Sequence, residues 1–226
     1  MKKIILIFAL VLASIFALSG CDCSNKKEID YVNYVSELRS NLYEGKSDNY
    51  SLKASYGFKE TPYQNDGKIG KKIYLLSFKL EKIENLEISY FLKFTHADKT
   101  YEKQFSLNHN KNALTCEIEI KDFTAQNFTV EVGTLQEKES VVMQSIIPKN
   151  ALDFKGAIQA LIKNQPSLIE SYTNSNGEFN GEIYARILVK DGKAYWYIGI
   201  ANGNGALKAL LIDGISGEVL AVREVF

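Results

Sequence analysis

The sequence predicts a β-rich α+β protein with a helix and a seven-stranded antiparallel sandwich, followed by a helix and a three- to four-stranded antiparallel sheet. Three observations lead to this prediction. Apolar residues recur at helical spacing over residues 29–43, alternate with polar residues over residues 48–147, and form a second helical stripe over residues 150–166. The chain has 226 residues, of which 46% are hydrophobic. This content is too high for a disordered chain.

The first 20 residues predict a secretory signal peptide. Lys2 and Lys3 precede an apolar run over residues 4–18, in which only Ser14 is polar. A helix that spans a membrane needs about 20 apolar residues, whereas the apolar part of a signal peptide needs about 7–15. The length and the charged flank therefore favour a cleaved signal.

The residues that end this run, 18–21 (LSGC), resemble the lipobox of bacterial lipoproteins. The resemblance implies that the Cys21 thiol receives a diacylglyceryl group, that cleavage follows Gly20, and that the new amino terminus is open to acylation, for example by palmitate. Two acyl chains hold a protein stably at a membrane. We therefore expect a lipid-anchored protein of the cell membrane that faces the extracytoplasmic side. An ordinary signal peptide with a chance cysteine is the alternative.

Lysine is far commoner than arginine, and asparagine is abundant. This bias is typical of low-GC coding and favours a Gram-positive source, in which the protein would lie on the outer face of the membrane. The mature chain would begin with a polar tether over residues 21–28.

Residues 29–43 predict an amphipathic helix that lies on the following domain. Gly45 follows as a stop signal. The apolar residues at helical spacing are Tyr31, Val35, Leu38 and Leu42.

Seven runs of alternating apolar and polar residues predict seven strands. They lie within residues 50–56, 74–80, 86–94, 101–107, 114–120, 128–132 and 141–147. Seven strands in about 100 residues, separated by polar turns, favour an antiparallel sandwich that is immunoglobulin-like in strand number only, since the Cys–Trp–Cys pattern is lacking. Residues 29–148 would therefore form one domain.

Residues 149–226 predict a second, α+β domain. Asn150 can cap its helix, and Asp191 and Gly192 form a favoured two-residue hairpin turn. The register set by this turn places apolar residues opposite one another on one face, which we expect to be the core face. The opposed pairs are Val189 with Ala194, Ile187 with Trp196, Ala185 with Ile198, and Ile183 with Ile200.

A helix followed by such a sheet resembles the PepSY domain, which is cystatin-like. Residues 194–198 (AYWYI) and 211–220 (LIDGISGEVL) carry the resemblance. It implies a domain of secreted and membrane-bound bacterial proteins that binds or restrains peptidases. No protease pattern accompanies it in these 226 residues.

Cys116 shares a predicted strand face with Leu114, Ile118 and Ile120, so it is expected to be a small buried hydrophobic residue. A disulfide between Cys23 and Cys116 is the alternative in an oxidising compartment.

The sequence contains no recognisable catalytic constellation. His96 and His109 lie in polar turns, and there is no nucleophile elbow, phosphate loop or metal-ligand spacing. We therefore expect a non-enzymatic protein without a metal or a cofactor other than the lipid on Cys21. Carboxylates such as Glu117 and Glu119, which share a strand face, leave an envelope hydrolase open.

The 27 basic and 27 acidic residues balance, so the sequence offers no electrostatic basis for binding nucleic acid. One patch stands out as a candidate binding surface, because tyrosine and arginine dominate binding hot spots. This patch, called the tyrosine face below, consists of Tyr184, Arg186, Leu188, Tyr195 and Tyr197 on one side of the predicted hairpin. The alternatives are that it packs on the sandwich or the last strand, or is an ordinary strand surface.

These observations together predict a membrane-anchored lipoprotein that binds a protein, a peptide or an envelope component. An envelope hydrolase that uses Asp or Glu carboxylates and a structural spacer without a ligand are the alternatives. The sequence indicates neither the identity of a partner nor the oligomeric state.

Overall fold

The computed structural model describes residues 29–62, 69–81, 88–109, 113–202 and 207–225. In these ranges the chain is mostly β-structure, with two short α-helices and one 3-10 turn. The elements are η1 (Tyr31–Tyr34), β1 (Val35–Lys46), β2 (Ser51–Glu60), β3 (Lys72–Leu80), β4 (Phe91–His96), β5 (Lys99–Gln104), β6 (Ser106–Asn108), β7 (Ala113–Glu119), β8 (Asn127–Gly133), β9 (Lys138–Ser145), α2 (Phe154–Asn164), α3 (Pro166–Ser171), β10 (Gly181–Lys190), β11 (Lys193–Asn202), β12 (Leu207–Asp213) and β13 (Val219–Val225).

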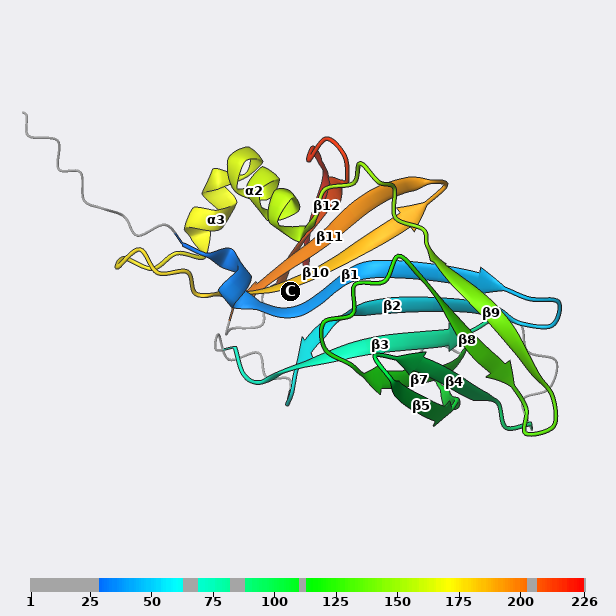
Figure 1. The fold of residues 1–226 in the computed structure, drawn as a ribbon. Helices are drawn as coiled ribbons and strands as arrows, with labels where there is room; N and C mark the ends of the chain where they lie inside the picture. Colours follow the sequence, from blue (N-terminus) through cyan, green and yellow to red (C-terminus); the bar gives the residue numbers. More distant parts are fainter. Residues whose placement is uncertain (1–28, 63–68, 82–87, 110–112, 203–206, 226) are drawn as a thin grey trace, which may run out of the picture.

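The thirteen strands of the described ranges belong to one connected sheet, shown in Figure 1. Its main path runs in the order β13-β12-β11-β10-β1-β2-β3-β7-β6. A branch leaves β1 through β9 and continues to β8, β4 and β5. The branch folds over β1, β2, β3 and β7, and a first core lies between these two layers.

Strand β1 connects the two halves of the molecule. Its first half pairs in parallel with β10, and its end pairs with β9 through Tyr43 and Glu44. Strand β2 pairs with β1 over most of its length. Tyr43 therefore packs in the core between the layers, whereas Val35 packs in a second core that lies under the helices.

The helix predicted over residues 29–43 is wrong. Only the 3-10 turn η1 forms there, and it leads directly into β1. Register shifts occur between Val35 and Glu37 opposite β10 and between Arg39 and Asn41 opposite β2. Such bulges break the alternation of a strand, so its apolar residues fell at helix-like spacing. Pairing with three strands from distant parts of the chain outweighs the local pattern.

The predicted seven-stranded sandwich and separate PepSY-like domain are also wrong. The sandwich region holds the eight strands β2 to β9, because the run over residues 101–107 divides into β5 and β6 around the buried Phe105. Strands β10 to β13 do not form a small separate sheet with one helix. Their sheet continues through β10 into β1, and two helices, α2 and α3, lie on it (Figure 1).

The predicted limits of the two domains, 29–148 and 149–226, stay predictions. Strand β1 pairs with strands on both sides of the expected boundary.

Several local predictions are confirmed. The register of the β10–β11 hairpin is the expected one, with Ile187 opposite Trp196 and Ala185 opposite Ile198. Of the eight predicted core residues of this hairpin, seven are buried and Val189 is partly exposed.

The predicted Asn150 cap is not formed. Asp153 caps α2 instead, by accepting a 2.8 Å hydrogen bond from the Gly156 N–H.

The expectation for Cys116 is confirmed as well. Its side chain is buried in the core between the layers and forms no disulfide with a described residue. Burial raises its pKa to about 12, because the thiolate would lose its hydration there. Cys21 and Cys23 lie outside the described residues.

The second core lies between the helices and β10–β12. Phe154 and Leu161 of α2 face Trp196 and Ile198 of β11 in this core. The Trp196 indole N–H donates a 2.9 Å hydrogen bond to the Leu152 carbonyl, so its one polar atom is satisfied. The helices therefore cover one face of the hairpin and leave the other face for the candidate site.

Candidate functional site

The tyrosine face lies on the side of β10 and β11 opposite the helices. Side chains alternate along a strand, so burial of Ile187 and Trp196 on one face turns the intervening residues to the other. Arg186 lies opposite Tyr197, and Leu188 lies opposite Tyr195. The Leu188 side chain is 43% exposed, and the other four members of the face are partly exposed.

Strand β12 extends the tyrosine face by one strand. Leu211 lies opposite Tyr197, and Asp213 lies opposite Tyr195. At the other end, the Tyr184 hydroxyl donates a 2.6 Å hydrogen bond to Oε2 of Glu182, a fully buried carboxylate. This bond fixes the position of the Tyr184 ring, so this part of the face is preorganised.

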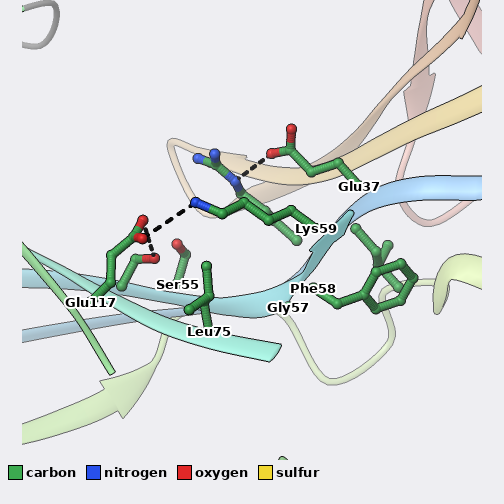
Figure 2. Close-up of a pocket in the computed structure, with 10 residues that line it drawn as sticks. Glu37, Ser55, Gly57, Phe58, Lys59, Leu75 and Glu117 are labelled. Carbon is green, nitrogen blue, oxygen red and sulfur yellow. Dashed lines mark hydrogen bonds and ion pairs between the residues drawn. The ribbon is translucent and has the colours of Figure 1, made fainter. Parts of the chain in front are cut away.

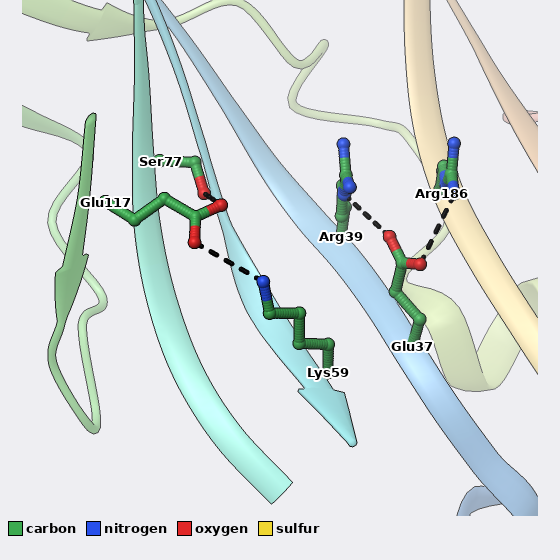
Figure 3. Close-up of polar contacts among 6 residues, drawn as sticks. All are labelled: Glu37, Arg39, Lys59, Ser77, Glu117 and Arg186. Carbon is green, nitrogen blue, oxygen red and sulfur yellow. Dashed lines mark hydrogen bonds and ion pairs between the residues drawn. The ribbon is translucent and has the colours of Figure 1, made fainter. Parts of the chain in front are cut away.

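Arg186 joins the tyrosine face to charged side chains on β1. Its Nη2 lies 3.3 Å from Oε2 of Glu37, whose Oε1 lies 2.8 Å from Nε of Arg39 (Figure 3). The parallel pairing of β1 with β10 places Glu37 beside Tyr184 and Arg39 beside Arg186. One carboxylate is therefore held between two guanidinium groups.

A second cluster of charged and polar side chains lies on β2, β3 and β7, beside the cluster of Glu37, Arg39 and Arg186. Nζ of Lys59 lies 3.3 Å from Oε2 of Glu117, and the Ser77 hydroxyl donates a 3.2 Å hydrogen bond to Oε1 of the same carboxylate. Figure 3 shows both groups on one face of the sheet. We call the whole row the ionic strip; it consists of Glu37, Arg39, Arg186, Lys59, Ser77 and Glu117.

A shallow hollow lies between the two groups of the ionic strip (Figure 2). Its floor includes Gly57, where a Cβ atom would lie 1.8 Å from the Leu38 carbonyl oxygen, so only glycine fits the close approach of β1. The hollow encloses about 30 Å³. Pockets for small molecules usually enclose about 300–1,000 Å³. The hollow is therefore a dimple in a surface and too small for a metabolite.

Two buried polar atoms of the ionic strip have no hydrogen bond. They are Oε1 of Glu37 and Nε of Arg186. Glu37 Oε1 is close to Arg39, but the contact is an ion pair without hydrogen-bond geometry. Most buried polar atoms in proteins have a partner, and one left without costs about 1–3 kcal/mol. Both atoms are shielded from solvent, so this cost is internal to the fold.

The residues considered for catalysis do not converge. His96 stacks on Phe94, and His109 is an exposed residue just after β6. Within the described ranges, no group of three or more His, Cys, Asp or Glu side chains could hold a metal ion. Glu117 and Glu119 lie exposed on one strand face, as expected, and Glu117 is held by Lys59 and Ser77. Whether the protein is an enzyme stays a prediction.

Comparison of the chain with protein-family models, with curated proteins and with solved structures gives no significant match. Among the helices in the described ranges, none is long and apolar enough to cross a membrane. Cys21, the expected lipidation residue, lies outside these ranges.

Sequence reasoning missed most of the ionic strip. Glu37 and Arg39 were hidden because their segment was expected to be a helix, where residues two apart lie on different faces. In a strand the same spacing places both on one face. Residues 207–213 are mostly apolar, so no alternation in this segment indicated which face Leu211 occupies.

Proposed function

We propose that this protein is a lipid-anchored binding protein of the cell envelope that contacts a protein or peptide through the tyrosine face and the adjoining ionic strip. The proposed location rests on residues 18–21 and on the signal that precedes them. The proposed binding role rests on the geometry of the sheet face.

The observation that carries the binding role is the exposed apolar and aromatic surface of the tyrosine face around the Arg186 guanidinium. Leu188 is 43% exposed, and the three tyrosines of the same face are partly exposed. Binding hot spots are enriched in aromatic residues and arginine, and this face presents both. The ~30 Å³ hollow favours a partner with an extended surface over a small molecule.

The proposal is tested by placing a photo-crosslinking amino acid at Leu188 in cells with native envelopes. Val142 on β9 is the matched control, because it is also an exposed apolar strand residue, at 52%. The proposal predicts a discrete adduct from position 188 that is missing from position 142. The same adducts from both positions, or none from position 188, would contradict it.

The envelope-hydrolase alternative remains open to a direct assay. Turnover of wall glycan or peptide by the purified protein, lost in Glu117→Gln, would support that alternative over a binding role. The spacer alternative requires that neither an adduct nor turnover is found.

A further inference from the structure

A second hollow lies at one end of the two-layered region, away from the tyrosine face. It is formed where β3 begins, where β7 ends and where β5 begins, and it encloses about 560 Å³. This volume lies in the range usual for ligand pockets. We call it the lysine groove; its side chains include Lys72, Lys99, Lys121, Tyr74, Tyr101 and Glu119.

The charge of the lysine groove is unbalanced, because three lysines face one glutamate. Some strand lysines of the described residues are paired with carboxylates, as Lys59 is with Glu117 and Lys93 is with Glu131, whereas others are not. None of the three groove lysines forms an ion pair with a described residue.

Two of these lysines are positioned by aromatic rings. Nζ of Lys72 lies 4.7 Å from the centre of the Phe58 ring, and Nζ of Lys99 lies 4.8 Å from the centre of the Tyr101 ring. A cation over a ring is attracted to its face, so both ammonium groups favour positions over these rings.

Lys72 is also partly removed from water. Burial lowers its pKa, and the nearby Glu60 carboxylate opposes this shift only in part. Glu60 is itself buried, and its Oε1 accepts a hydrogen bond from the Gly70 N–H at 2.6 Å. Because Glu60 offsets the burial of Lys72 only in part, a further anion bound beside Lys72 is favoured.

From this arrangement we infer that the lysine groove binds a multiply charged anion that carries phosphate or carboxylate groups. The three ammonium groups bind the charges, and Tyr74 and Tyr101 line the hollow beside them. A flat membrane surface fits less well, because the lysines line a hollow. This site does not depend on the proposed function of the tyrosine face.

The test is isothermal titration of the full-length protein in neutral detergent with inorganic tripolyphosphate and, separately, with citrate. Three proteins are compared: wild type, a groove variant and a control variant with the same change in charge. The groove variant carries Lys72→Gln, Lys99→Gln and Lys121→Gln; the control carries Lys138→Gln, Lys155→Gln and Lys163→Gln at exposed positions outside the groove. Thermal melts confirm that each variant is folded.

The inference predicts saturable binding of at least one probe at about one site per chain. The affinity falls at least tenfold in the groove variant and stays within twofold of wild type in the control. Preference for one probe identifies phosphate or carboxylate as the recognised group.

Equal weakening of binding in both variants, or no saturable binding of either probe, would overturn the inference. So would binding to vesicles that contain phosphatidylglycerol without binding to either soluble probe. If the groove variant is unfolded, the single variant Lys99→Gln, at an exposed position, gives the same comparison against Lys138→Gln.

Discussion

The close contact between Gly57 and β1 makes a sharp prediction about the strand that carries Glu37 and Arg39. In Gly57→Ala the added Cβ would lie 1.8 Å from the Leu38 carbonyl oxygen and 2.9 Å from Cα of Arg39. Ordinary contact begins at 3.4 Å, so the two backbones must separate by about 1.6 Å. No side-chain rotation relieves the clash, because all three nearest atoms belong to the backbone of β1.

Overpacking that forces backbone shifts typically costs about 1–3 kcal/mol and occasionally more, and a clash that no side chain can relieve lies at the upper end. We therefore expect Gly57→Ala to lower the free energy of unfolding by at least about 3 kcal/mol. In a chain of this size, that corresponds to a fall in Tm of roughly 6–12 °C. Gly199→Ala is the matched control, because its Cβ would meet only the Leu207 side chain closely, at 3.1 Å. Its free energy of unfolding should change by less than about 1 kcal/mol.

The assay is thermal unfolding followed by circular dichroism, with urea unfolding as a second measure of the free energy. If Gly57→Ala melts within about 2 °C of wild type, β1 and β2 do not approach as described, and the geometry of the ionic strip is wrong.

Three further predictions concern single side chains. Asp153→Ala should destabilise the protein by about 1 kcal/mol, because the cap of α2 is lost, whereas Asn150→Ala should change stability by less than about 0.5 kcal/mol. Urea unfolding measures both changes, and a larger loss in Asn150→Ala would contradict the observed cap. Cys116 should resist alkylation by iodoacetamide at pH 8 in the folded protein and react fully in urea, because burial raises its pKa to about 12. Mass spectrometry of the Cys116 peptide measures the labelling. Rapid labelling of the folded protein would show that the thiol is accessible. Hydrogen bonds from Ser216 and Ile215 lower the pKa of Asp213 below its ordinary 3.8. The ionised carboxylate therefore stabilises the fold at neutral pH. This stabilisation is lost as the pH falls from about 3.8 through the pKa of the folded state. Asp213→Ala should therefore be less stable than wild type at pH 7 and approach it at low pH in thermal melts, and a constant difference at all pH values would argue against the cause given.

The sequence was sufficient where one short stretch determines its own structure. The turn at Asp191 and Gly192 determined the register of the hairpin, because a two-residue turn permits one pairing and the apolar residues agree with it. The tyrosine face followed from the same register. The expected strand around Cys116 was also found, since its alternation is unbroken.

The sequence failed where distant strands decide the outcome. The segment from Val35 becomes a strand because β2, β9 and β10 pair with it, and its bulges conceal the alternation. The same pairing merges the expected C-terminal sheet with the rest of the fold. The ionic strip could not be predicted, because it joins residues of β1, β2, β3, β7 and β10 that lie far apart in the chain. No local pattern encodes such contacts.

The central claim is that the tyrosine face binds a partner, and the most direct test compares capture from native envelopes. Wild type and the variant Tyr195→Ser with Tyr197→Ser are used as full-length proteins after thermal melts confirm that they are folded. The variant Val142→Ser with Leu135→Ser removes two exposed apolar side chains elsewhere and serves as the control. We expect one partner that wild type and the control capture by cross-linking and that the tyrosine variant loses. Equal capture by all three proteins would show that the tyrosine face is not the binding site.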